Sequence, residues 1–261
     1  MSVGDDLLRS GDIEGARATL IETVKRTPND QASRMFLWQL MALSGDWDKA
    51  VSQLRVLAQL SAEAQMLATV YHQAITAEQT RLSAYAGKTP FNVLVSSSPW
   101  IDGLAQSLGA LATGDAQAAE RLRDEAFDQA GDTPGTVGDE KFGWIADIDS
   151  RLGPAFEAIV SGKWGLIPFE AITRIKTEGA KDLRDLIWLP VELFLRSGQS
   201  AAALLPVRYP GTEACSNALR LARETSWLEI DGEETPVGQR IWSTDTGVEV
   251  GILDFNELLL A

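Results

Sequence analysis

The sequence predicts an α+β protein in which an N-terminal α-helical repeat domain precedes a small antiparallel β-rich domain. Three observations support this fold class. A phrase of the form small–Gly–Asp–x–x–x–Ala occurs at residues 10–16, 44–50 and 113–119. Residues 131–143 contain four Gly and one Pro, which is typical of a linker. Beyond them, short apolar runs separated by Gly turns replace the helical spacing, as expected for strands.

Each copy of the phrase predicts the turn between two paired helices. Gly can adopt the left-handed conformation that ends a first helix, and Asp can cap the second helix with its side-chain oxygen. Ala lets the two helices approach closely. Gly11 and Gly45 lie 34 residues apart, and this period resembles that of the tetratricopeptide repeat, with Ala16 and Pro28 also at matching positions. We therefore expect a tetratricopeptide-like array in residues 1–133.

The expected helices follow one another along this domain. Apolar residues recur at helical spacing after the first phrase as far as Val24, and a second helix ends before Ser44. Residues 64–87 keep the helical pattern but lack a Gly-Asp turn, so they predict one longer helix. Residues 87–98 predict a loop, after which Pro99 opens the last helix pair.

We place the domain boundary between residues 133 and 134, which gives domains 1–133 and 134–261. The second domain contains five of the eight Trp residues, so we expect its strands to enclose a core in a partly closed antiparallel sheet. One or two short helices are expected, near 144–152 and 216–223. Strands joined by Gly turns are expected in three stretches, 155–177, 189–209 and 227–255.

The formal net charge of the chain is −14, and acidic residues exceed basic ones in both domains. A field of this sign repels phosphate backbones, so we expect no nucleic-acid partner. The charge either keeps the surface soluble or attracts a basic segment of another protein. The N-terminal residues do not form a signal peptide, and no apolar run approaches the length of a membrane span. We therefore expect a cytoplasmic protein without membrane contact.

No pattern in the sequence is typical of a catalytic, metal or cofactor site. His72 is the only histidine, and its helical surroundings favour a surface or groove position over a general base. Cys215 is the only cysteine and has no adjacent basic residue, so we expect it to be unreactive. The Gly-Lys within residues 160–165 lacks the flanking residues of a phosphate-binding loop. We therefore expect a protein that is not an enzyme and has no cofactor or metal.

The densest polar cluster consists of Asp147, Asp149 and Arg151. On a strand these side chains would share one face, and on a helix Asp147 and Arg151 would pair at i, i+4. Two carboxylates on one face could act in acid–base catalysis or hold a divalent cation, although the sequence places no further oxygen ligands. The alternative is an ion-pair network that orders the start of the β-rich domain, and we favour it.

Stacked helix pairs create a concave face lined by the first helix of each pair. Such grooves bind extended or helical segments of partner proteins. The alternative is that the apolar residues on this face belong to the core. The candidate groove residues are Met35, Phe36, Gln39, Thr69, Val70 and Gln73.

Five phrases run in linked order through nearly the whole chain. They are "LLRSGDIEGA", "FLWQLMALSGDWDKA", "TPGTVGDEKFGWIADIDSRLGP", "KDLRDLIWLP" and "ALLPVRYPGTEA". Together they resemble the ImpE/TagJ family, also called SciE, of accessory proteins of bacterial type VI secretion systems. The resemblance implies a cytoplasmic, non-catalytic adaptor that binds the N-terminal helix of the small contractile-sheath subunit. It also implies an influence on sheath handling by the AAA+ ATPase that disassembles the sheath.

Three functions are open at this point. The first is an adaptor that binds a helical segment of a sheath subunit. The second is a hydrolase or transferase that uses Asp147 and Asp149, which requires that these carboxylates line a pocket without a neutralising arginine. The third is a dimerisation module that exposes an apolar tryptophan patch.

Overall fold

The computed structural model describes residues 3–96, 98–230 and 233–261 of the chain. Helices form the first part of the fold. The fifth is a single helix of 24 residues, as expected from the missing Gly-Asp turn in 64–87. The helices are α1 (Val3–Arg9), α2 (Ile13–Arg26), α3 (Gln31–Leu43), α4 (Trp47–Leu57), α5 (Ala62–Tyr85), α6 (Trp100–Ala112) and α7 (Ala116–Gln129).

The three repeated phrases form the turns that the sequence predicts. Their glycines have φ angles between 75° and 88°, the left-handed conformation that ends the preceding helix. Asp12 and Asp115 each accept a hydrogen bond from the backbone N–H three residues later, at 2.8 and 3.0 Å. Asp46 differs, because its side chain makes no cap and forms ion pairs with Arg17 and Lys49 instead.

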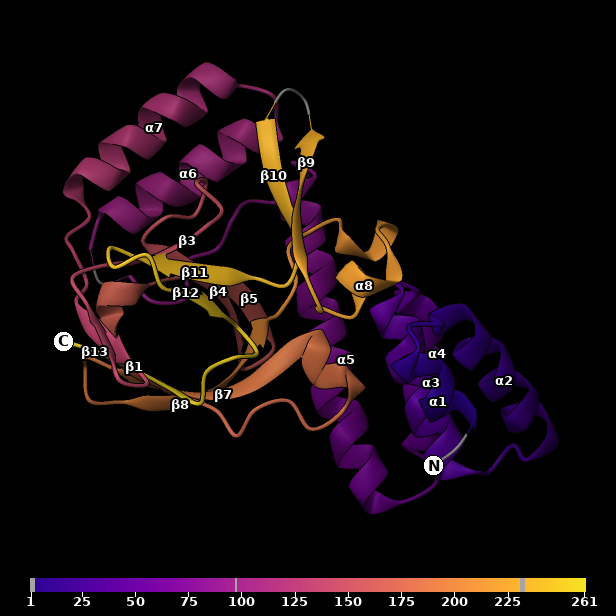
Figure 1. The fold of residues 1–261 in the computed structure, drawn as a ribbon. Helices are drawn as coiled ribbons and strands as arrows, with labels where there is room; N and C mark the ends of the chain where they lie inside the picture. Colours follow the sequence, from indigo (N-terminus) through magenta and orange to yellow (C-terminus); the bar gives the residue numbers. More distant parts are fainter. Residues whose placement is uncertain (1–2, 97, 231–232) are drawn as a thin grey trace.

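The helix pairs do not form one continuous stack. Figure 1 shows α1 to α4 together in one lobe, while the α6–α7 hairpin lies on the strand-rich part and α5 runs between them. The ring of Phe127 on α7 lies against Gly153, which follows β3 (Ile145–Asp147). The last helix pair therefore covers strands rather than extending the array of the first two pairs. The tetratricopeptide-like character of the helices stays a prediction.

Strands and short helices form the rest of the fold. The helix expected near 216–223 is confirmed by α8, but the one expected near 144–152 is wrong. There the chain forms β3 and a turn, because side chains of Asp147 and Asp149 accept backbone hydrogen bonds that compete with a helix. The short helices are η1 (Phe169–Ala171), η2 (Leu183–Leu186), η3 (Thr212–Ala214) and α8 (Asn217–Arg220). The other strands are β1 (Gly135–Val137), β2 (Glu140–Phe142), β4 (Ala155–Val160), β5 (Lys163–Pro168), β6 (Ile172–Lys176), β7 (Trp188–Leu195), β8 (Ser200–Pro206), β9 (Thr225–Ile230), β10 (Glu233–Gly238), β11 (Ile241–Thr244), β12 (Glu249–Gly251) and β13 (Glu257–Leu260).

The named strands pair antiparallel, as expected, and in the described residues they form three sheets. The largest has eight strands in the order β2-β1-β13-β6-β7-β8-β4-β5, so it exceeds the small domain that the sequence suggests. A three-stranded sheet, β12-β11-β3, and a two-stranded ribbon, β10-β9, complete the set. The last strand of the chain, β13, lies between β1 and β6, and the sheets curve around a common interior (Figure 1).

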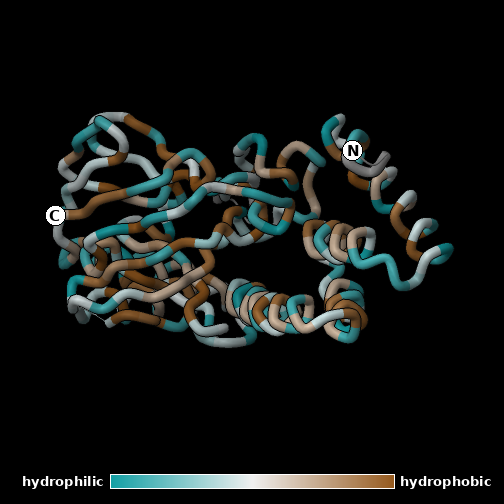
Figure 2. Tube along the Cα trace, turned by 90° about the horizontal axis from the view of Figure 1, so that it is seen from below, coloured by the Kyte–Doolittle hydropathy of each residue, from teal (hydrophilic) through white to brown (hydrophobic). Residues whose placement is uncertain are grey.

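Two hydrophobic clusters form the core. One lies among the strands around Trp242, and the other contains helix residues such as Trp38 together with Trp164 and Trp188 from the strands. Figure 2 shows the helical lobe directly beside the strand-rich lobe. Because the second cluster contains residues on both sides of residue 133, the two predicted domains share a core. The division into domains 1–133 and 134–261 stays a prediction. In the described part of the chain, every helix is too short or too polar to cross a bilayer.

Candidate partner-binding surface and buried charge network

A hollow of about 370 Å³ lies between helices α4 and α5. Two of the candidate groove residues, Thr69 and Gln73, line it, together with His72, the single histidine of the chain. Its apolar floor and polar rim suit one side of an amphipathic helix. The remaining lining residues are Val51, Leu54, Arg55, Ala58, Gln65 and Ala68.

Val70, a third candidate, lies on α5 beside this hollow and is open to solvent. Its side chain is 51% exposed, and that of Met66, one turn earlier, is 75% exposed. Residues four apart share a helix face, so the two form an apolar strip on α5. The alternative that Val70 belongs to the core is therefore wrong. Met66 was not among the candidates, although its spacing from Val70 was a readable signal.

The other three candidates lie on α3, away from an open surface. Gln39 is buried, while Met35 and Phe36 are half-buried and pack against the core. The chain's own η2 packs on α3. Met35 and Phe36 therefore belong to the core, as the alternative reading of these positions expects. The six candidates do not form one continuous groove.

The C-terminal part of the chain covers the turns between the first helices. Arg208 donates from Nη1 to the carbonyl oxygens of Leu43 and Arg220, each at 2.9 Å. Arg220 also forms an ion pair with Glu14 of α2 at 2.7 Å. The side of the helices that we expected to receive a partner is therefore partly filled by this chain, whereas the hollow between α4 and α5 is open.

Asp147, Asp149 and Arg151 form neither a strand face nor a helix turn. β3 ends at Asp147, whose carboxylate accepts a hydrogen bond from the N–H of Asp149 at 2.9 Å. Arg151 donates from Nε and Nη2 to the two carboxylate oxygens of Asp149, at 2.7 and 2.6 Å. The ion pair is therefore an i, i+2 pair within a turn, and not the i, i+4 pair considered for a helix.

Asp147 pairs with an arginine that lies outside the predicted cluster. Arg240, between β10 and β11, donates from Nη1 to one oxygen of Asp147. The hydroxyl of Tyr209 donates to the other oxygen at 2.9 Å. Asp147 and Asp149 are only 4% and 2% exposed. Both carboxylates are therefore buried and paired with arginines, which is the arrangement of an ion-pair network.

Glu157, in β4, is the centre of a larger buried network. Arg81 of α5 donates to both of its carboxylate oxygens, at 2.8 and 2.9 Å, and Arg240 donates to it as well. The indole N–H of Trp164 donates to it at 2.9 Å. Arg81 also pairs with Glu78 on its own helix at 2.8 Å. The network therefore joins α5 to β4 and, through Arg240, to β3.

Burial and ion pairing have opposite effects on the pKa values in this network. Burial alone would raise the pKa of Glu157, but Arg81 and Arg240 outweigh it and lower the pKa to about 2. Burial raises the pKa of Asp147 to about 6, against the opposing effect of Arg240. Burial also lowers the pKa of Arg208 to about 10. Asp147 therefore titrates closer to neutral pH than Glu157 does.

The raised pKa of Asp147 predicts a pH-dependent contribution to stability. From about pH 4 to 6 the folded chain retains a proton that the unfolded chain has released, so this contribution to the free energy of unfolding falls as pH rises. Glu157 acts oppositely, because its contribution is lost as pH falls from about 4.5 toward 2. In urea unfolding, the stability of the wild type relative to Asp147→Asn should decrease by about 1–3 kcal/mol from pH 4 to 6. A constant difference over this range would contradict the prediction.

Glu157 and its arginine partners are not among the site residues that the sequence predicts. A signal existed for Glu157, because it is the single charged residue in the strand "AFEAIV", which is otherwise apolar. Glu78 and Arg81 share a face of α5 with buried alanines, which was a second signal. Nothing in the sequence connects Arg240 with Glu157, since 83 residues separate them.

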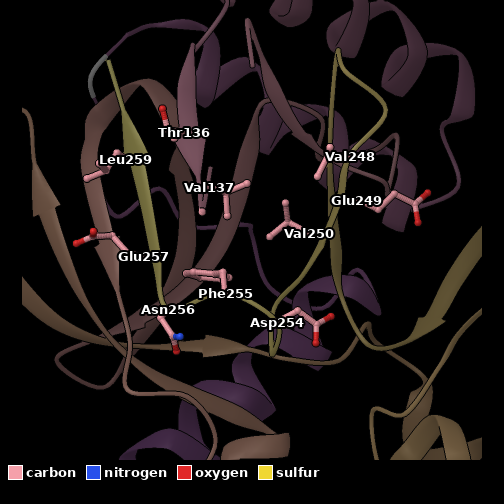
Figure 3. Close-up of a pocket in the computed structure, with 11 residues that line it drawn as sticks. Thr136, Val137, Val248, Glu249, Val250, Asp254, Phe255, Asn256, Glu257 and Leu259 are labelled. Atoms are coloured by element: carbon pink, nitrogen blue, oxygen red, sulfur yellow. The ribbon is translucent and has the colours of Figure 1, made fainter. Parts of the chain in front are cut away.

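A second hollow, of about 430 Å³, lies between β1, β12 and β13 (Figure 3). Val137, Val250 and Phe255 line its interior, while the carboxylates of Glu249 and Asp254 lie at its periphery. Its lining contains no histidine, cysteine or lysine. Within residues 3–96, 98–230 and 233–261, no group of three or more His, Cys, Asp or Glu side chains is arranged to hold a metal ion.

The comparisons with known proteins agree with the resemblance read from the sequence. The family model described as "ImpE protein" matches residues 139–259. Over 257 residues the chain is 41% identical to the type VI secretion system accessory component TagJ of Pseudomonas aeruginosa, a match that covers 98% of this chain and 90% of that protein. The chain belongs to the ImpE/TagJ family.

The fold of this ImpE/TagJ family member also occurs in a solved structure. The crystal structure of protein VPA1032 from Vibrio parahaemolyticus superposes with a TM-score of 0.87, at 24% sequence identity. The superposition covers 100% of this chain and 98% of the other. The α+β arrangement, with helices before antiparallel sheets, is therefore shared along the whole chain.

Proposed function

We propose that this chain is a cytoplasmic, non-catalytic accessory component of a bacterial type VI secretion system that binds a helical segment of a partner. The partner is the small contractile-sheath subunit, bound through its N-terminal helix. The complex modulates sheath handling by the AAA+ ATPase that disassembles the sheath. The match to TagJ of Pseudomonas aeruginosa over 98% of the chain supports the accessory role. A tetratricopeptide-like architecture of the first helix pairs belongs to the same proposal.

The observation that carries the binding proposal is the open surface on α5. Met66 and Val70 form an exposed apolar strip beside the hollow between α4 and α5. A helix laid along α5 would bury apolar area in both, at about 25 cal/mol per Å². Arg55 and His72 line the hollow and no carboxylate does. We therefore propose that the apolar face of the partner helix makes the contact, and not a basic face drawn to an acidic rim.

The hydrolase or transferase alternative has no support from the carboxylates that suggested it. Arg240 neutralises Asp147, and Arg151 neutralises Asp149. Both carboxylates are buried, so a substrate would have to displace an arginine to reach either of them. We therefore retain the binding function.

Val70→Asp should weaken binding of the purified small sheath subunit by about tenfold or more, because it places a charge in the centre of an apolar contact. Isothermal titration calorimetry measures the affinity. Leu259→Asp is the matched control, since Leu259 on β13 has a similar exposure of 45% and the same change of charge. A sheath subunit that lacks its N-terminal helix should not bind. Equal binding by the shortened subunit, or an equal loss with Leu259→Asp, would place the contact elsewhere.

A further inference from the structure

Strand β9 has an unpaired edge. It pairs with β10 alone, in a ribbon that stands apart from the eight-stranded sheet (Figure 1). Among the strands that the structure describes, none pairs with the other side of β9. Exposed edges of this kind are the sites at which extended segments of other chains add to a sheet.

The hydrogen-bond alternation identifies the backbone groups on this edge. The N–H of Gln239 donates to the carbonyl oxygen of Glu224 at 3.0 Å, so this facing pair is a hydrogen-bonded one. In antiparallel ribbons hydrogen-bonded and non-hydrogen-bonded pairs alternate. The pair after Glu224 is therefore a non-hydrogen-bonded one, so alternate residues of β9, starting with Thr225, turn their N–H and C=O away from β10. These outward-facing residues are Thr225, Trp227 and Glu229.

Two large apolar side chains lie on the same edge strand. Trp227 is 46% exposed and Leu228 is 41% exposed, whereas Pro236 and Val237 on β10 are buried. Neighbouring side chains point to opposite faces of a strand. A strand added to β9 would therefore cover Trp227 on one face and Leu228 on the other.

Glu229 provides the charge that distinguishes between possible occupants. It lies directly opposite Glu234 on β10, and both side chains are exposed. Neither forms an ion pair with a Lys or Arg in the described ranges of the chain. Like charges placed directly opposite each other destabilise a strand pair. A Lys or Arg on an added strand, opposite Glu229, would relieve this repulsion.

We propose that β9 is a docking edge for an extended, basic segment of a partner protein. The segment adds antiparallel to β9 and places an apolar side chain beside Trp227 and a Lys or Arg beside Glu229. A second copy of this chain fits less well, because self-pairing centred on Trp227 would set Glu229 against Thr225 and leave its repulsion with Glu234 in place. This site is separate from the α5 surface and does not depend on the proposed function.

A synthetic peptide tests the proposal on the full-length chain. The probe, acetyl-Thr-Lys-Val-Ile-Thr-Val-amide, places Lys opposite Glu229 and Ile opposite Trp227, and a second peptide has Glu in place of Lys. We expect the Lys peptide to slow hydrogen exchange at the amides of Trp227 and Glu229. The Glu peptide should bind at least about fivefold more weakly than the Lys peptide, because the ion pair with Glu229 is lost and a repulsion between two carboxylates is added.

Glu229→Ala and Glu229→Pro form a matched pair of variants. Both remove the carboxylate, but only Pro removes the outward N–H, which β10 does not use. Relative to wild type, Ala should weaken binding of the Lys peptide about threefold, and Pro about tenfold further. Unchanged thermal unfolding of both variants would show that the ribbon is intact.

Three results would overturn the proposal. The first is equal binding of the Lys and Glu peptides, and the second is equal binding of the Lys peptide by the Ala and Pro variants. The third is a dimer in light scattering whose amides at Trp227 and Glu229 are already protected without peptide, which would assign the edge to a second copy of the chain.

Discussion

Replacing Glu157 with Gln should lower the free energy of unfolding by about 3–5 kcal/mol, because it leaves two buried guanidinium groups without their shared carboxylate. Glu157 is 1% exposed and accepts hydrogen bonds from Arg81, Arg240 and Trp164. Gln keeps the size of the side chain and one hydrogen-bond acceptor. The decrease in the free energy of unfolding therefore measures the effect of removing the charge and not a change in packing. Urea unfolding followed by circular dichroism measures the change.

Glu120→Gln is the control for this substitution. Glu120 is exposed on α7, and the same chemical change there should alter stability by less than about 0.5 kcal/mol. A loss below about 1 kcal/mol for Glu157→Gln would mean that the buried arginines find other partners or water, and that the network contributes little to the stability of the fold.

Trp188→Ala should destabilise the chain by about 3–5 kcal/mol, through the loss of a large buried side chain and the cavity that remains. Trp188 is fully buried, and its ring lies 5.9 Å from that of Trp47 and 6.3 Å from that of Tyr71. Its indole N–H also donates to Glu78 at 2.9 Å. The side chain therefore connects β7 to α4 and α5.

Trp188→Phe separates packing from hydrogen bonding. Phe retains most of the ring contacts but leaves Glu78 without this donor, at an expected cost of about 1–2 kcal/mol. Thermal or urea unfolding of both variants should therefore rank wild type above Phe and Phe above Ala. If Phe and Ala destabilise equally, the hydrogen bond to Glu78 dominates and the packing argument is wrong.

Much of the helical part could be predicted because its signals are local. Gly11 and Asp12 end one helix and begin the next through their own backbone and side-chain geometry. The strand stretches were also readable from Gly turns between apolar runs. The position of β13 between β1 and β6 could not be read, because strand order depends on contacts between residues more than 80 positions apart. The turn after β3 was missed because Asp side chains replaced the helical hydrogen bonds.

The sequence predicts the exposed residues of the candidate site correctly only where no distant segment of the chain covers them. Thr69 and Val70 are exposed on α5, as the helical register suggests. Met35 and Phe36 follow the same register on α3, but the chain folds back and packs η2 against that helix. Which face of a helix stays open depends on segments more than 100 residues away. Helical periodicity alone therefore predicts which residues share a helix face, but not which segment of the chain covers that face.

The ion pair between Arg81 and Glu157 restricts how the polypeptide can be divided. A cut within residues 131–143 would leave the cation on one fragment and its anion on the other. Arg81 would keep Glu78 and Glu157 would keep Arg240, but each would lose one partner of the buried network and the apolar surface around it would be uncovered. Separating the two parts of the polypeptide would therefore cost a buried salt link and expose apolar surface that both parts now cover.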